Sequence, residues 1–171
     1  MNSLELVKCI QQDVKARRIF KGIFPHDWLL PALEKLRLER KPYVILCNTQ
    51  DSSQKGEHWV SITVNKPAGI VEYFCSLGLP PPHLNIHNFL FQCLPSANVI
   101  YNHRSIQHVS SIACGLYVLY YVVMKARGVS LRKCLSPFSS VHQWQNDRIV
   151  RNKVIHLLRK ARVYEPRMVK P

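Results

Sequence analysis

The sequence predicts an α+β fold formed by a single domain, and three observations lead to this prediction. The chain has 171 residues, a length at which one domain can bury a sizeable core. Short apolar runs rich in β-branched residues lie between segments whose apolar residues recur at helical spacing. These segments follow the order helix, strands with a central hairpin, helix, strand, helix, which is typical of α+β domains. We expect one domain over residues 1–171, with 166–171 forming a frayed tail.

The first part of the chain is predicted to be helical. Apolar residues recur among charged ones from residue 4 to residue 19, which is typical of an amphipathic helix. Residues 22–25 contain a glycine and a proline and are expected to end this helix. Residues 31–38 are expected to form a short second helix, because leucines recur along them.

Strands are predicted in the middle of the chain. Residues 43–47 form a short apolar run that we interpret as a buried strand. Residues 58–64 and 70–75 are expected to be antiparallel strands, because residues 65–69 carry the composition of a hairpin turn. Residues 99–101 are a further strand candidate.

Three more helices are predicted in the second half of the chain. Residues 83–94 have the apolar spacing of a helix. Residues 114–126 are apolar nearly all round, so they form a buried central helix or a buried strand, and their length favours the helix. Gly128 is expected to end it. Residues 143–161 mix apolar and basic side chains, which predicts a basic amphipathic helix.

The charge of the chain is strongly positive. Twenty-four Lys and Arg residues stand against ten Asp and Glu residues, a formal net charge of +14. Small soluble domains typically carry a net charge of about 2–8, so the excess favours a polyanionic partner, most readily nucleic acid. The basic residues are dispersed without a compact sequence-reading motif, which predicts backbone binding with little base specificity. The alternative is a solvated surface that serves solubility.

Several kinds of protein are disfavoured by composition. No apolar run reaches the roughly 18 residues of a membrane-spanning helix. Residues 1–5 lack a basic region followed by an apolar stretch, so no signal peptide is expected. The six cysteines are scattered and form no CxxC pair. We therefore expect no structural zinc site and free thiols in a reducing compartment.

The residues that carry chemistry lie in three short stretches. Residues 56–59 read Gly-Glu-His-Trp, residues 73–78 read Tyr-Phe-Cys-Ser-Leu-Gly, and Gln107 precedes Cys114 by seven positions. A thiol protease needs a base, an orienting group, an oxyanion donor and a nucleophile. These stretches supply a base, an oxyanion donor and a nucleophile in the expected order, but a cysteine, Cys75, stands where an orienting carboxylate is expected.

Cys114 is the candidate nucleophile and His58 the candidate general base. Cys114 opens the predicted central helix, where unpaired N–H groups and the helix dipole favour a thiolate. His58 would take the proton of Cys114 and later protonate the leaving amine. Gly56 and Trp59 single out this histidine among eight. The alternatives are a buried structural cysteine that caps an apolar helix and a histidine that fills the core or the surface.

Gln107 and Cys75 complete the candidate site. The side-chain NH₂ of Gln107, with the backbone N–H of Cys114, would face the developing oxyanion; a solvated loop glutamine is the alternative. Cys75 holds the orienting position, where a neutral thiol is only a weak acceptor. Three possibilities stay open: a Cys–His dyad, substitution by Glu72, or weakened catalysis. Strand alternation puts Glu72 on the face opposite Cys75, which disfavours the second. A soft metal ion trapped by His58, Cys75 and Cys114 would act as an inhibitor, not as a cofactor.

These stretches resemble the adenovirus-type cysteine proteases (adenains) and, more distantly, the proteases that cleave ubiquitin-like modifiers. The resemblance spans residues 20–155. Such enzymes carry His-Trp on a strand, an acid at the end of the next strand, then Gln, then Cys-Gly opening a buried helix. The present chain departs from this pattern only at the acid, where Cys75 stands. The resemblance implies an adenain-like fold with a mixed central sheet packed between helices and the nucleophile at the N-terminus of the buried central helix. Gly56, Trp59, Gly115 and the segment 22–28 are expected to shape the substrate groove; core packing is the alternative for Trp59 and for 22–28.

The resemblance further implies a thiol endopeptidase that cleaves capsid and core precursors during virion maturation, in the virion and the host nucleus. Small residues, especially Gly, are expected near the scissile bond. No cofactor is expected to be required; the resemblance implies DNA and a short peptide as activating cofactors, with Cys93 as a candidate contact for the peptide. We expect a monomer with no membrane partner and no required metal. Alternatives are a mobile-element protease, a deconjugating protease for ubiquitin-like modifiers, and a degenerate homologue that binds nucleic acid or protein.

Overall fold

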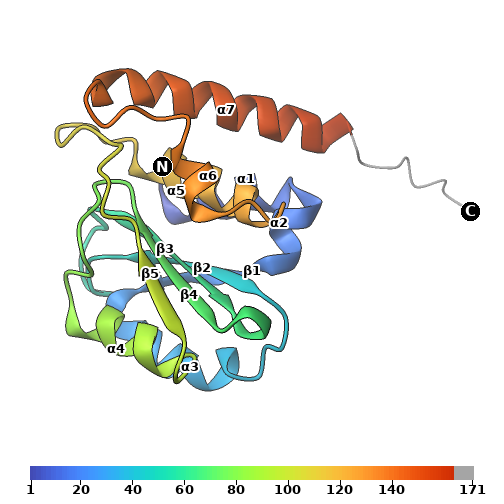
Figure 1. Ribbon diagram of the computed structural model, residues 1–171, viewed down its shortest axis with the longest axis vertical. Helices are drawn as coiled ribbons and strands as arrows, with labels where there is room; N and C mark the ends of the chain where they lie inside the picture. The colour runs from blue at the N-terminus through green and yellow to red at the C-terminus, as the bar shows by residue number, and fades with distance from the viewer. Residues whose placement is uncertain (164–171) are drawn as a thin grey trace, which may run out of the picture.

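The computed structural model describes residues 1–163, with side chains through Arg159, and its centre is a five-stranded mixed sheet (Figure 1). The strands lie in the order in which they occur along the chain. The outer pairs are parallel and the two inner pairs are antiparallel. The strands are β1 (Phe20–Pro25), β2 (Tyr43–Asn48), β3 (Trp59–Asn65), β4 (Ile70–Cys75) and β5 (Asn98–Tyr101).

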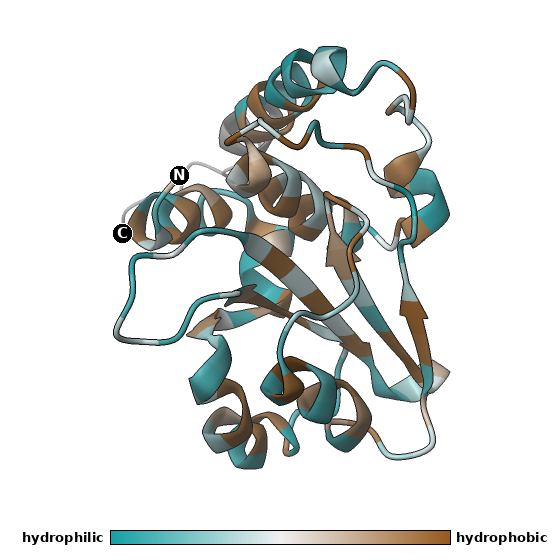
Figure 2. Ribbon diagram, turned by 90° about the vertical axis from the view of Figure 1, so that its left-hand side faces the viewer, coloured by the Kyte–Doolittle hydropathy of each residue, from teal (hydrophilic) through white to brown (hydrophobic). Residues whose placement is uncertain are grey.

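Helices cover both faces of the sheet, which confirms the predicted α+β class (Figure 1). One face carries α1 (Ser3–Gln11), α2 (Val14–Ile19), α5 (Cys114–Lys125), α6 (Leu131–Leu135) and α7 (Gln143–Val163). The other face carries α3 (Leu29–Leu36) and α4 (Leu84–Gln92). Short 3₁₀ turns, η1 (His26–Trp28) and η2 (Lys66–Ala68), connect elements. The buried apolar residues therefore form two clusters, one on each side of the sheet. In Figure 2 brown apolar segments run along the strands, and the helices mix brown and teal.

Most predicted elements are present with small shifts of their ends, and three differ. The helix expected over 4–19 is two helices, because Asp13 caps α2 by accepting the N–H of Ala16 at 2.9 Å. Residues 22–25 do not simply end a helix, since they belong to edge strand β1, where Gly22 has φ +138°. Helix α6 was not predicted.

The expected frayed tail over 166–171 lies outside the described residues. Within the described part of the chain, no helix has both the length and the apolar composition needed to span a membrane.

The sheet brings the candidate catalytic residues to one end. His58 directly precedes β3, Cys75 is the last residue of β4, and Val60 pairs with Cys75 in the antiparallel register. Helix α5 packs on β3 and begins at Cys114. Because antiparallel neighbours place the start of one strand beside the end of the next, His58 and Cys75 meet at the edge where α5 starts.

Candidate active site

His58 and Cys75 are in direct contact. The Nε2 atom of His58 lies 3.3 Å from the Sγ atom of Cys75. His58 is half-buried and Cys75 is 1% exposed. The residue at the orienting position therefore faces the imidazole, as the sequence predicts, although it is a thiol.

Both members of this pair are shifted toward their neutral forms. Burial lowers the pKa of His58. Burial, opposed in part by neighbouring backbone N–H groups and reinforced by Cys114, raises the pKa of the Cys75 thiol. Two neutral groups can share a hydrogen in either direction. Donation from Nε2–H to sulfur leaves Nδ1 free to act as a base, whereas donation from S–H to Nε2 puts the ring hydrogen on Nδ1. A carboxylate would allow only the first arrangement.

Cys114 stands at the N-terminus of α5 with 8% of its surface exposed. Cys114 shares a buried cluster with Trp59 and Phe74, the residues next to His58 and Cys75, and a negative charge on Cys114 raises the pKa of Cys75. Within the described residues, no hydrogen bond joins His58 to Cys114. Such contacts are often long without substrate. The arrangement brings His58, Cys75 and Cys114 together and leaves the base–nucleophile bond unformed.

Gln107 is buried in the loop that leads to Cys114. Its backbone N–H donates to Ser76 O at 3.0 Å, and its Oε1 accepts the Ser76 hydroxyl at 2.5 Å. Its Nε2 donates to Ser111 O at 2.7 Å and is 3.4 Å from Ser111 Oγ. One hydrogen of the Gln107 side-chain amide is thus donated to the Ser111 carbonyl. The other has only the 3.4 Å contact with Ser111 Oγ.

The groove residues predicted from the sequence lie around the start of α5. The indole N–H of Trp59 donates to the Met1 carbonyl at 3.1 Å, and a Cβ on Gly115 would lie 2.8 Å from Met1 Cβ. A Cβ on Gly56 would lie 1.7 Å from the Asn48 amide nitrogen, so a side chain here would require the Asn48 side chain to move. A cavity of about 290 Å³ continues from Trp59 and Gly56. Its other lining residues include Ile23 and Pro25 of the 22–28 segment, which the sequence suggests as part of the groove.

Sequence reasoning missed several polar residues that hold these groups in place. Asn102 accepts the backbone N–H of Cys75 at 2.8 Å and donates to its carbonyl at 2.6 Å. Ser111 and Asp147 are bonded at 2.6 Å beside the Gln107 loop. Single Asn, Ser and Asp residues far apart in the sequence carry no local pattern, so no signal in one sequence could have found them.

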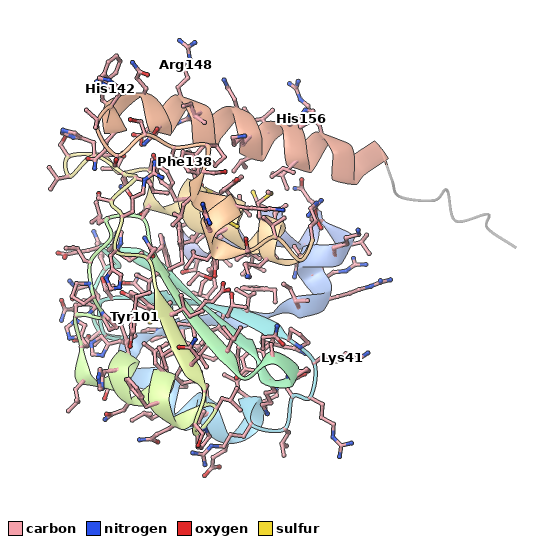
Figure 3. All side chains as sticks on the ribbon, viewed as in Figure 1. Lys41, Tyr101, Phe138, His142, Arg148 and His156 are labelled. Carbon is pink, nitrogen blue, oxygen red and sulfur yellow. The ribbon has the colours of Figure 1, made fainter. Side chains whose placement is uncertain are left out.

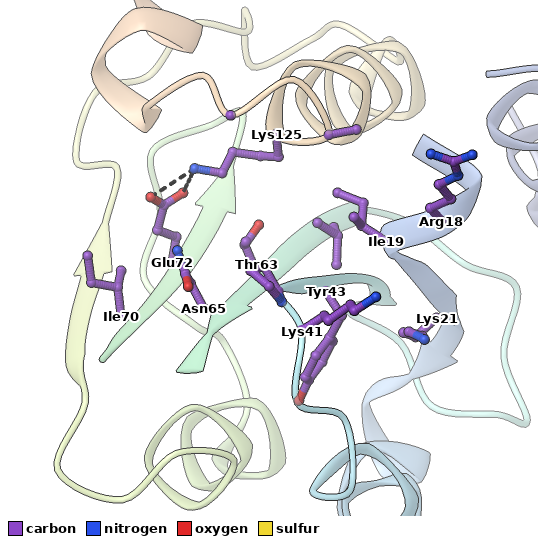
Figure 4. Close-up of a pocket in the computed structure, with 14 residues that line it drawn as sticks. Arg18, Ile19, Lys21, Lys41, Tyr43, Thr63, Asn65, Ile70, Glu72 and Lys125 are labelled. Carbon is purple, nitrogen blue, oxygen red and sulfur yellow. Dashed lines mark hydrogen bonds and ion pairs between the residues drawn. The ribbon is translucent and has the colours of Figure 1, made fainter. Parts of the chain in front are cut away.

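Glu72 does not replace the missing acid. Its carboxylate accepts the Tyr121 hydroxyl at 2.7 Å and pairs with Lys125 at 2.8 Å (Figure 4). It lines a cavity of about 720 Å³ at the opposite end of β4 and α5, beside Arg18 and Lys41. The expectation from strand alternation is therefore confirmed.

Two further expectations concern metals and Cys93. Across the described residues, no group of three His, Cys, Asp or Glu side chains is arranged to hold a metal ion. Cys93 is 2% exposed, and its thiol lies 3.5 Å from the Leu90 carbonyl. Direct contact between the Cys93 thiol and a peptide would therefore require this segment to open.

Comparison with solved structures places the fold. No protein-family model matches the chain, and no curated protein matches it. The SUMO protease Ulp1, in a form with its catalytic cysteine oxidised to a sulfonic acid, is similar with a TM-score of 0.56 and 11% identity. The match covers 94% of this chain and 78% of that one.

The ASFV pS273R protease is also similar, with a TM-score of 0.48 and 20% identity. That match covers 67% of this chain and 42% of the viral protease, so the chain spans less than half of its length. The five-stranded mixed sheet, its covering helices and the Ulp1 likeness together fix the fold class. The chain has an α+β fold similar to that of the SUMO protease Ulp1.

Proposed function

We propose that the chain is a cysteine endopeptidase with Cys114 as nucleophile and His58 as general base. The observation that carries the proposal is the meeting of three residues distant in the sequence. His58 contacts Cys75. Trp59, the residue beside His58, shares a buried cluster with Cys114 at the start of α5. Cys–His pairs at helix N-termini are a recurrent way to activate a thiol.

The reaction proceeds in two stages, formation of a thioester on Cys114 and hydrolysis of that thioester, and His58 transfers protons in both. His58 takes the proton of the Cys114 thiol, and the sulfur forms a C–S bond with the scissile carbonyl carbon while the π electrons move to oxygen. The intermediate collapses with cleavage of the C–N bond, and the leaving amine takes the proton from the imidazolium. Water, deprotonated by His58, then hydrolyses the thioester and restores the thiol.

The developing oxyanion needs donors beside Cys114. Backbone N–H groups in the first turn of α5 have no earlier partner within the helix, and the Cys114 N–H is the donor that we assign. The second amide hydrogen of Gln107 is the other. Loss of one such donor typically costs about 3–4 kcal/mol of transition-state stabilisation.

The substrates that we infer are precursor proteins of a virion. We infer that cleavage takes place next to small residues, and that it occurs in the virion and in the host nucleus. The preference for small residues is inferred from the resemblance to adenains. DNA is the second inferred partner, supported by the formal charge of +14. Figure 3 shows Arg148 projecting from α7 away from the body of the molecule. A short activating peptide stays part of the proposal.

The test is cleavage of a fluorogenic peptide with Gly at the scissile bond, with and without duplex DNA. The parent chain, Cys114→Ala and Cys75→Asp are compared. Activity that disappears in Cys114→Ala supports a protease with a dyad-like site. If the parent is inactive and Cys75→Asp cleaves, the missing acid has silenced it. No cleavage by either chain, at any DNA concentration, contradicts the proposal.

A binding module is the second candidate, and Cys75 favours it. A neutral thiol cannot stabilise an imidazolium as a carboxylate does, and burial lowers the pKa of His58. In this alternative the fold and the basic surface serve nucleic-acid or protein binding. This alternative is supported if neither the parent chain nor Cys75→Asp cleaves the peptide while the parent chain still binds DNA.

A further inference from the structure

The first turns of α7 hold the loop that carries Gln107. Gln143 Nε2 donates to the Ser105 carbonyl at 3.2 Å, and Asn146 Nδ2 donates to the Ile106 carbonyl at 2.7 Å. Asp147 follows directly. Residues at i, i+3 and i+4 share one face of a helix, so a single face of α7 contacts the segment that leads to the nucleophile.

Asp147 joins three parts of the molecule through two hydroxyl groups. Its Oδ2 accepts the Ser111 hydroxyl at 2.6 Å, and its Oδ1 accepts the Tyr117 hydroxyl at 2.9 Å. Ser111 belongs to the loop and Tyr117 to α5. The carboxylate therefore links α7, the loop before Cys114 and the first turn of α5.

Ser111, which is bonded to Asp147, also forms hydrogen bonds with the segment that carries the proposed oxyanion donors. Because its hydroxyl hydrogen is given to Asp147, its oxygen lone pairs are free to accept. The Oγ atom accepts the Ala113 N–H at 3.1 Å, one residue before Cys114. The Ser111 carbonyl accepts the Gln107 amide at 2.7 Å. The orientation of Ser111 thus constrains both Gln107 and the backbone at Ala113.

A carboxylate suits this position better than an amide. Two hydroxyl hydrogens point at the residue, and an ionised carboxylate accepts both while carrying no hydrogen of its own. Burial, together with the hydrogen bond and the charge of Asp147, raises the pKa of Tyr117, so its hydroxyl stays a donor. An asparagine would present its NH₂ to one of these hydroxyls.

The geometry points to Asp147 as a positioning residue of the active site: through Ser111 it holds Gln107 and the backbone before Cys114 where the oxyanion donors are needed. This inference rests on the proposed cysteine protease. Asp147 touches no reacting atom and acts through its contacts with Ser111 in the loop and Tyr117 in α5.

The test separates oxyanion stabilisation from thiol reactivity. Asp147→Asn is compared with the parent and with Gln145→Ala, an exposed control two residues earlier on the same helix. Peptide hydrolysis forms an oxyanion, whereas alkylation of Cys114 by iodoacetamide displaces iodide and forms none. Misplacement of catalytic groups by about 1 Å costs up to ~100-fold. We expect kcat to fall about 10- to 100-fold in Asp147→Asn, KM to change less than about twofold, and the alkylation rate to stay at the parent value.

A double-mutant cycle with Ser111→Ala sharpens the assignment. If Asp147 acts through Ser111, the double variant loses no more kcat than the worse single variant, because the two residues share one path. Fully additive losses overturn that path. An unchanged kcat in Asp147→Asn overturns the inference, and so does an equal fall in alkylation and hydrolysis, which indicates general loss of structure.

The parent measurement keeps the two proposals apart. If neither the parent nor Cys75→Asp shows Cys114-dependent cleavage, the proposed function fails, whatever Asp147 does. Hydrogen exchange of the amides at 107–113 then decides the structural part. Faster exchange in Asp147→Asn than in Gln145→Ala supports the hold on the loop, and equal exchange overturns it.

Discussion

At the scale of single residues, the chemistry turns on the thiol at position 75. The imidazole of His58 has the burial of a catalytic base without the negative neighbour that would stabilise its charged form. Burial lowers the pKa of His58, whereas a carboxylate at position 75 would stabilise the imidazolium and raise that pKa. We therefore expect Cys75→Asp to raise kcat/KM about tenfold or more.

The same substitution has a defined pH dependence. An aspartate at 75 raises the pKa of His58, so the imidazolium persists at higher pH and the Cys114 thiolate forms beside it at lower pH. Alkylation of Cys114 near pH ~6 should be faster in Cys75→Asp than in the parent. Cys75→Asn is the matched control, since it has the shape of aspartate without the charge. Equal gains in both variants would show that shape, not charge, limits the parent.

Gly78 is a second residue at which a single added atom, the Cβ of an alanine, is expected to lower the stability of the fold. Its φ is +67°, and an added Cβ would lie 2.6 Å from the backbone nitrogen of Ser105. Gly69 has a similar φ of +64°, with nothing within 4 Å of its Cβ position. Gly69→Ala should cost about 1–2 kcal/mol from the left-handed backbone alone. Gly78→Ala should cost more, and urea unfolding of the two variants measures the difference. Equal losses would mean that the 104–105 segment moves freely, which contradicts a firm hold on the loop to Gln107.

At the scale of elements, the N-terminal helices depend on one aspartate. Asp13 caps α2 and pairs with Arg127, which follows α5, at 2.5 Å. Its side chain is 2% exposed, whereas that of Arg127 is 27% exposed. Asp13→Ala removes a cap and a charged hydrogen bond, so we expect a loss of about 2–3 kcal/mol in the free energy of unfolding.

Asp13→Asn separates the two contributions. Asparagine is an equally good N-cap, so only the ion pair is lost and the loss should be roughly half as large. Urea unfolding curves for the two variants give both values. If Asn is as damaging as Ala, the ion pair carries the whole effect and the cap contributes nothing.

Elements were predictable where local composition and burial agree. Strand β4 matches the predicted 70–75 in full, because turn residues bound an apolar run on both sides. Helix α5 begins at Cys114 as predicted, since its apolar run is too long for a strand. Strand β1 was missed because its residues form a strand through parallel pairing with β2. Its glycine and proline indicate only the end of a helix, and they carry no signal for this long-range pairing. The break at Asp13 was missed because apolar spacing continues across it.

At the scale of the whole molecule, the sequence indicated which residues could take part in catalysis, whereas the contacts between them depend on the folded arrangement of the strands and helices. His58 and Cys75 meet through the β3–β4 register. Strand alternation correctly separated Glu72 from Cys75, because that rule is local. The polar supports, Asn102 and Asp147, reach the site from distant segments, and only tertiary packing places them there.

The net charge is a property of the whole molecule, and it predicts binding that depends on salt. A protein that neutralises phosphates releases counterions, and each neutralised phosphate contributes about 0.9 to the slope of log K against log salt. Arg148 and Arg151 are exposed on α7. We expect affinity for duplex DNA to fall at least about tenfold from about 50 to about 200 mM salt, with little dependence on sequence.

Substitutions at these two arginines test whether α7 binds the DNA. Arg148→Gln with Arg151→Gln should weaken DNA binding for every sequence and reduce the salt slope by about 1 for each phosphate that is no longer neutralised. The matched control, Arg148→Lys with Arg151→Lys, keeps both charges and should retain the slope, because phosphate neutralisation needs charge more than a planar fork. Fluorescence anisotropy at several salt concentrations measures both. An unchanged slope in the Gln variant would move the DNA-binding surface away from α7, and salt-independent binding by the parent would remove the electrostatic basis of DNA recognition altogether.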